Sequence, residues 1–66
     1  MHPQTQHHDA IQAARAMMDR YGLRASAIAA ERIAEAQVSG QTDRLDHWRQ
    51  VAMAIAELGR TRAKAH

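Results

Sequence analysis

The stretch GQTDRLDHWRQVAMAIAEL, from Gly40 to Leu58, decides the fold because it joins a helix stop, a short turn and the clearest amphipathic run of the chain. Its large apolar residues recur at steps of three, four and three, the spacing of one face of an α-helix. They are Trp48, Val51, Ile55 and Leu58. Thr42 or Asp43 can cap the first turn. The stretch therefore predicts a helix over about residues 42–59.

Upstream of this stretch, residues 23–39 form an alanine-rich segment of high helix propensity. Its apolar face is broad and made mainly of small side chains. Gly40 follows the segment at the position where a left-handed residue commonly ends a helix. We therefore expect a second helix over about residues 23–39, placed centrally because small side chains permit close approach of its neighbours.

Residues 9–21 carry a third helical pattern, and Gly22 follows it as a stop signal. Asp9 is the expected N-cap. The apolar face of this segment comprises Ile11, Ala14, Met17, Met18 and Tyr21. Since no β-strand pattern occurs, the sequence predicts an all-α protein, either a small three-helix bundle or a helical hairpin with a third helix. Residues 9–59 are the expected single domain, residues 1–8 a disordered N-terminus and residues 60–66 a frayed basic tail.

Two spaced patterns resemble a known group. AxxMxxxYGxxAxxxAxxR begins at Ala14 and GxxDxxxxWxxVxxAIxxL begins at Gly40. Together they resemble short, all-helical hypothetical proteins of alphaproteobacteria over about residues 10–58. Gln41 stands where members often carry aspartate, and Arg44 where they carry a second glycine. The resemblance implies an all-helical fold and a bacterial cytosolic setting, and it implies no catalytic residues.

The composition of the chain argues against several classes of function. The chain has no cysteine, which excludes thiolate chemistry and fits the cytoplasm, and it lacks both a membrane-spanning run and a secretory h-region. His2, His7 and His8 lack a second ligand pair at helical spacing, so we expect no metal site and no cofactor. Asp43, Asp46 and His47 lie at a helix start, where capping explains the acids. We therefore expect no enzyme.

The predicted core is thin, since fifteen alanines accompany one tryptophan, one tyrosine and no phenylalanine. Short chains with thin cores are commonly stabilised by association. We therefore expect a non-enzymatic protein–protein interaction module that pairs with a second copy, as a homodimer, or with a partner helix. Its expected contact residues are Met17, Met18, Tyr21, Trp48, Val51, Ile55 and Leu58. Each is equally compatible with an intramolecular core.

A small nucleic-acid-associated regulator is the alternative function. It would use the basic residues Arg44, Arg49, Arg60, Arg62 and Lys64. Against it, the formal net charge is only +2, and Asp43 and Asp46 accompany the first two arginines. The alanine-rich segment also offers few side chains able to contact base edges.

Overall fold

The computed structural model describes the backbone of residues 3–64 and the side chains of residues 9–61. Its elements are α1 (Pro3–Tyr21), the short 3-10 helix η1 (Gly22–Arg24), α2 (Ala25–Ser39) and α3 (Thr42–Lys64). Within residues 3–64 only residues 40 and 41 lie outside helical structure, and no strand occurs. The all-α prediction is confirmed.

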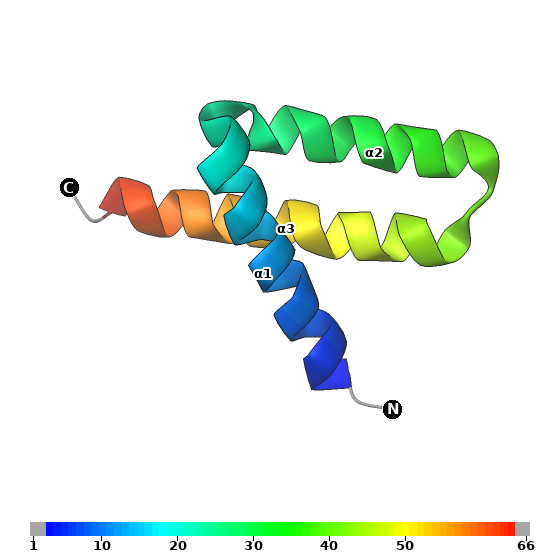
Figure 1. Ribbon diagram of the computed structural model, residues 1–66, viewed down its shortest axis with the longest axis horizontal. Coiled ribbons are helices and arrows are strands. Elements are labelled where there is room, and N and C mark those ends of the chain that lie inside the picture. The colour runs from blue at the N-terminus through cyan, green and yellow to red at the C-terminus, as the bar shows by residue number, and fades with distance from the viewer. Residues whose placement is uncertain (1–2, 65–66) are drawn as a thin grey trace.

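The helices form an antiparallel hairpin of α2 and α3, with α1 crossing α3 at a steep angle (Figure 1). α3 contacts both other helices extensively, whereas α1 and α2 meet mainly near the η1 turn. The arrangement is flat, with principal extents of 40 × 27 × 16 Å. One side of the crossing between α1 and α3 therefore has no third helix over it.

The α2–α3 turn is built on Gly40, which adopts φ +69° and ψ +25°. The Gly40 amide donates to the Gln37 carbonyl at 3.3 Å, and the Gln41 amide donates to the Ala36 carbonyl at 3.0 Å. These two bonds form the motif that satisfies the last carbonyls of a helix when the next residue is left-handed. The predicted role of Gly40 is confirmed.

The α1–η1 junction uses the second left-handed glycine. Gly22 has φ +60°, and the residues after it form the 3-10 turn before α2 begins at Ala25. Because a side chain at positive φ is strained, a glycine permits this sharp reversal most easily. The predicted stop at Gly22 is confirmed, while α2 begins two residues later than the expected Leu23.

The core lies where the helices cross, and small side chains dominate it. Five of its buried members are alanines, and the cluster comprises Ala10, Ala14, Met17, Ala25, Ala29, Val51, Ala54 and Ile55. Val51 is the largest side chain that is completely buried among the described residues. The alanines let the helices approach closely, but they contribute little apolar area. The expected central position of the alanine-rich helix is wrong, because α3 is the helix that packs against both others and α2 packs mainly against α3.

The outer helix boundaries differ from those predicted. α1 begins at Pro3, so helix replaces the disorder expected over residues 3–8, and Asp9 lies inside the helix and is not its cap. Proline is favoured at the first helical position because its fixed φ suits a helix. Its lack of an amide hydrogen costs nothing there, since the first amides of a helix have no carbonyl partner within it. Residues 1 and 2 of the expected disordered segment lie outside the described residues.

At the other end, α3 continues to Lys64 and so extends past the expected end near Gly59. One glycine inside a helix costs only about 1 kcal/mol, and the arginines and alanine after it are good helix formers. The helix starts at Thr42, and the Leu45 amide donates to the Gln41 carbonyl at 3.0 Å. Gln41 therefore occupies the N-cap position, which corrects the predicted capping by Thr42 or Asp43.

None of the described helices is both long and apolar enough to span a membrane.

Candidate functional site

The seven predicted contact residues divide into three groups. Met17, Val51 and Ile55 are buried in the intramolecular core. Met18, Trp48 and Leu58 are partly buried and pack against that core. Tyr21 is exposed at 39%. The three buried residues leave little or no surface for a partner, so a contact surface must be built mainly from other side chains.

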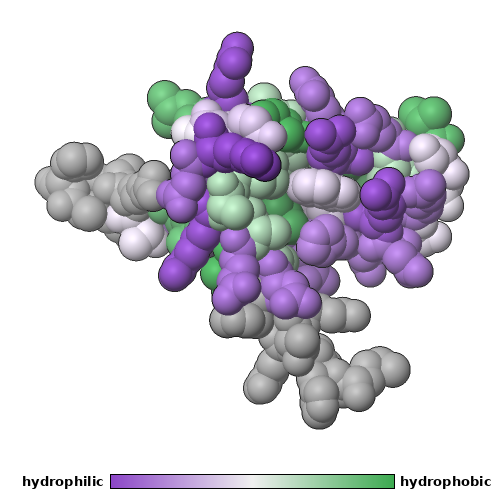
Figure 2. All heavy atoms as spheres, viewed as in Figure 1, coloured by the Kyte–Doolittle hydropathy of each residue, from purple (hydrophilic) through white to green (hydrophobic). Residues whose placement is uncertain are grey.

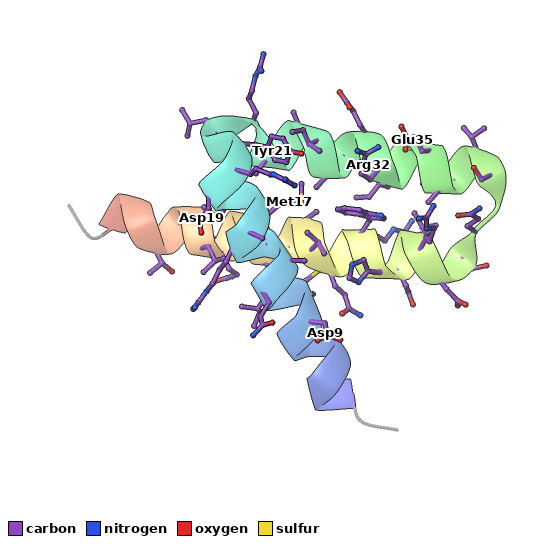
Figure 3. All side chains as sticks on the ribbon, in the orientation of Figure 1. Asp9, Met17, Asp19, Tyr21, Arg32 and Glu35 are labelled. Atoms are coloured by element: carbon purple, nitrogen blue, oxygen red, sulfur yellow. The ribbon has the colours of Figure 1, made fainter. Side chains whose placement is uncertain are left out.

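Trp48 packs against the core cluster and lines a hollow with Met17 and Tyr21 of α1 and Ile28 of α2. This hollow, of about 200 Å³, also has Arg20 and Arg32 on its walls. Figure 3 shows Met17, Tyr21 and Arg32 around this region, with Arg32 and Glu35 on the same side of α2. Trp48 therefore lies between α2 and the C-terminal part of α1.

Three large apolar side chains outside the predicted set are strongly exposed. Leu23 in η1 is fully exposed, Val38 at the end of α2 is 90% exposed and Met53 in α3 is 69% exposed. Figure 2 shows hydrophobic atoms protruding at both ends of α2, above an otherwise hydrophilic hairpin surface. Met53 lies between Gln50 and Glu57 on the polar side of α3, so the apolar periodicity of the helix does not select it.

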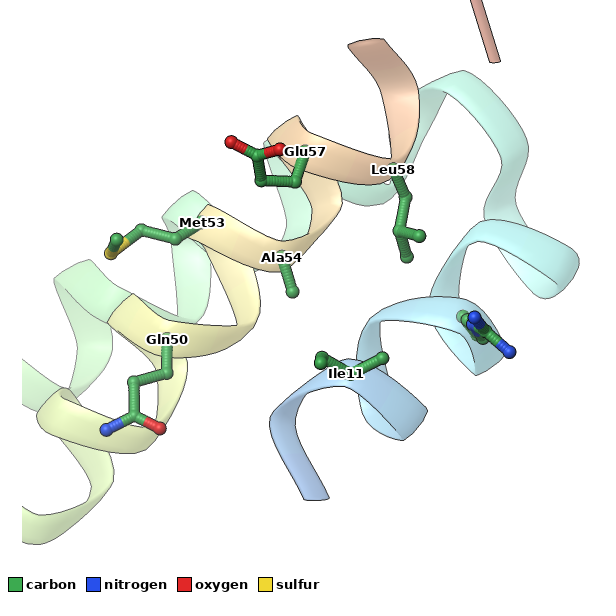
Figure 4. A pocket seen from close by; sticks show the side chains of 7 residues that line it. Ile11, Gln50, Met53, Ala54, Glu57 and Leu58 are labelled. Carbon is green, nitrogen blue, oxygen red and sulfur yellow. The ribbon is translucent and has the colours of Figure 1, made fainter. Parts of the chain in front are cut away.

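An apolar groove runs between α1 and α3, and we call it the α1/α3 groove. It encloses about 280 Å³. Its walls are Ile11 and Arg15 of α1 and Gln50, Met53, Ala54, Glu57 and Leu58 of α3. In Figure 4, Ala54 and Leu58 point toward α1, where Ile11 lies, while Met53 points away from α1. The groove shares Arg15 and Leu58 with a neighbouring hollow of about 320 Å³, which also includes Met18, Asp19 and Thr61.

A second hollow is polar and lies near the start of α3. It encloses about 450 Å³ and is lined by Asp9, Asp43, Asp46, His47 and Gln50. Within the described residues, no group of three or more histidine, cysteine or acidic residues has the geometry to hold a metal ion. The His47 ring lies edge-on to the Trp48 ring, with centroids 5.6 Å apart. The predicted metal candidates His2, His7 and His8 lie outside the described side chains.

The structure spreads the predicted nucleic-acid residues along α3. Arg44, which donates to the Gln41 side chain at 3.3 Å, lies sixteen residues before Arg60, a separation of about 24 Å along the helix. Arg60 forms an exposed ion pair with Glu57 at 3.2 Å. Arg49 is also exposed, while the side chains of Arg62 and Lys64 lie outside the described ones. The described arginines do not form one cluster.

Both described ion pairs are exposed, and each joins residues three positions apart in one helix. They are Arg32 with Glu35 at 3.3 Å and Arg60 with Glu57. Such pairs contribute little to stability. In comparisons with protein-family models, with curated proteins and with solved structures, none matches this chain.

Proposed function

We propose that this protein is a non-enzymatic helical interaction module that associates with a second copy of itself. The observation that supports the proposal is the contrast between core and surface. Val51 is the largest fully buried side chain, while Tyr21, Leu23, Val38 and Met53 remain exposed. As the resemblance to the alphaproteobacterial group implies, we place this association in the bacterial cytoplasm.

The energetic motive is the apolar area that the monomer leaves in water. Full burial of a leucine or methionine side chain contributes roughly 1.5–3 kcal/mol. Alanines, which make up most of the core, contribute much less each. A second copy that covers even two of the exposed side chains therefore adds a stabilisation comparable to a large fraction of the net stability of a small domain.

Sedimentation equilibrium across a hundredfold range of concentration tests the proposal. We expect the weight-average mass to rise from that of the 7.4 kDa chain toward twice that value. The melting temperature should rise with concentration, because binding to the folded state alone stabilises it by mass action. A monomer at every concentration, with a cooperative melt that does not depend on concentration, would rule out self-association.

A further inference from the structure

We infer that the α1/α3 groove is the surface through which two copies of this chain pair about a two-fold axis, with Met53 of each copy seated in the groove of the other. This inference rests on the proposed self-association and identifies the surface that performs it. The exposed methionine at the rim and the apolar floor beside it are the two halves of the contact.

The groove lies on a side of the molecule that α2 does not cover. All seven residues that line it belong to α1 or α3, so α2 contributes no wall. Figure 4 shows Ile11, Ala54 and Leu58 in the space between α1 and α3. Ile11 and Leu58 are only partly buried by the fold, so a further side chain between them would remove additional apolar surface from water.

The same chain offers a side chain of suitable shape. Met53 lines the groove yet is 69% exposed, so most of its thioether projects beyond the wall. Methionine is unbranched and flexible, and it adapts to irregular apolar gaps. In a two-fold interface the same patch serves both partners, so a patch that holds both a projecting residue and a recess is self-complementary.

Charge separates this groove from two of the other hollows. Its ionisable residues are one cation, Arg15 on α1, and one anion, Glu57 on α3. Across a two-fold axis, Arg15 of one copy can therefore face Glu57 of the other. The hollow at Trp48 carries Arg20 and Arg32, and the polar hollow carries the three aspartates Asp9, Asp43 and Asp46. Two copies meeting at either of those would bring like charges together, which is unfavourable.

Sedimentation equilibrium of the Met53→Arg variant, compared with that of the Val38→Arg variant as control, tests the proposed surface. Both positions are exposed, so both variants should keep the wild-type helicity when diluted to monomer, as circular dichroism would show. We expect Met53→Arg to raise the dimer dissociation constant at least tenfold and Val38→Arg to leave it within twofold. If the wild type dimerises and the Met53→Arg variant dimerises equally well, the proposed surface is wrong, although self-association still stands. A monomeric wild type overturns the proposed function as well.

A charge exchange gives an independent measurement of the same pairing. Arg15→Glu and Glu57→Arg should each weaken dimerisation severalfold, and the double variant should recover most of the wild-type affinity. Arg49→Gln is the control, since Arg49 is an exposed cation of α3 that does not line the groove, and its affinity should match the wild type. Failure of the double variant to recover would contradict the facing of Arg15 and Glu57 across the axis.

Discussion

The backbone amide of Gln41 donates a 3.0 Å hydrogen bond to the carbonyl oxygen of Ala36, and this bond closes the end of α2. The carbonyl of Gln41 in turn accepts the first amide bond of α3, from Leu45. One residue therefore ends one helix and begins the next. The hairpin of α2 and α3 depends on Gly40 immediately before it, because Gly40 supplies the left-handed conformation.

Replacement of Gly40 by alanine should lower the free energy of unfolding by about 1 kcal/mol, since an L-residue is strained at φ +69°. A Cβ built there meets nothing within 4 Å, so the effect would come from backbone strain and not from a clash. Urea unfolding followed by circular dichroism measures it. Gly59→Ala is the matched control and should have the opposite sign, a gain of about 0.5–1 kcal/mol, because Gly59 lies inside α3 with open space around it. Equal effects at the two glycines would contradict this account of the turn.

Truncation of Val51 to alanine should cost about 2 kcal/mol of unfolding free energy, because Val51 is completely buried and its removal leaves a cavity at the crossing of the helices. The same substitution at Val38, which is 90% exposed, should change stability by less than about 0.5 kcal/mol. Chemical denaturation of both variants at one protein concentration gives the comparison. A Val51→Ala variant as stable as Val38→Ala would show that the crossing is not the core.

Enlargement of Ala29 to leucine should destabilise the fold by about 1–3 kcal/mol, because Ala29 is completely buried and a larger side chain would force the helices apart. Ala30, the next residue along α2, is exposed, and Ala30→Leu should be nearly neutral. Thermal melts of the two variants test the close packing of α2. A stabilised Ala29→Leu variant would indicate unfilled space there.

Trp48→Ala should lower the unfolding free energy by roughly 2 kcal/mol, less than the loss at a fully buried tryptophan, because the ring is only partly buried against the core. Trp48→Phe, which keeps an aromatic ring in the same place, should recover more than half of the loss. Neither variant retains a tryptophan, so denaturant titrations should be monitored by circular dichroism and not by tryptophan fluorescence. A Trp48→Ala protein with full stability would mean that the indole has no packing role.

Duplex DNA should give no gel shift with this protein even at low salt. The formal net charge is only +2, and the described arginines of α3 lie apart along the helix, where Arg44 and Arg60 also pair with nearby side chains. Nucleic-acid affinity depends chiefly on the number of phosphates that are neutralised together. A shift at about 50 mM salt that disappears by about 200 mM, the behaviour typical of phosphate binding, would support the nucleic-acid alternative.

Much of the site was out of reach of sequence patterns. The spacing of Trp48, Val51, Ile55 and Leu58 predicted one apolar face, and that face does point toward the core. The pattern could not separate Val51, which is completely buried, from Leu58, which also lines a groove. Nor could it select Met53, since a lone apolar residue among polar neighbours carries no periodic signal. Its importance depends on what lies beside it in space.

The sequence by itself determined the helices, the two left-handed glycines and the face of α3 that is buried. These properties follow from interactions between residues at most about four positions apart, which the order of side chains specifies directly. The tertiary structure alone decided that α1 crosses α3 steeply and leaves a groove open on the side that α2 does not cover. That angle depends on how small side chains such as Ala14, Ala29 and Ala54 fit together across the crossing, a contact between segments that no local pattern encodes.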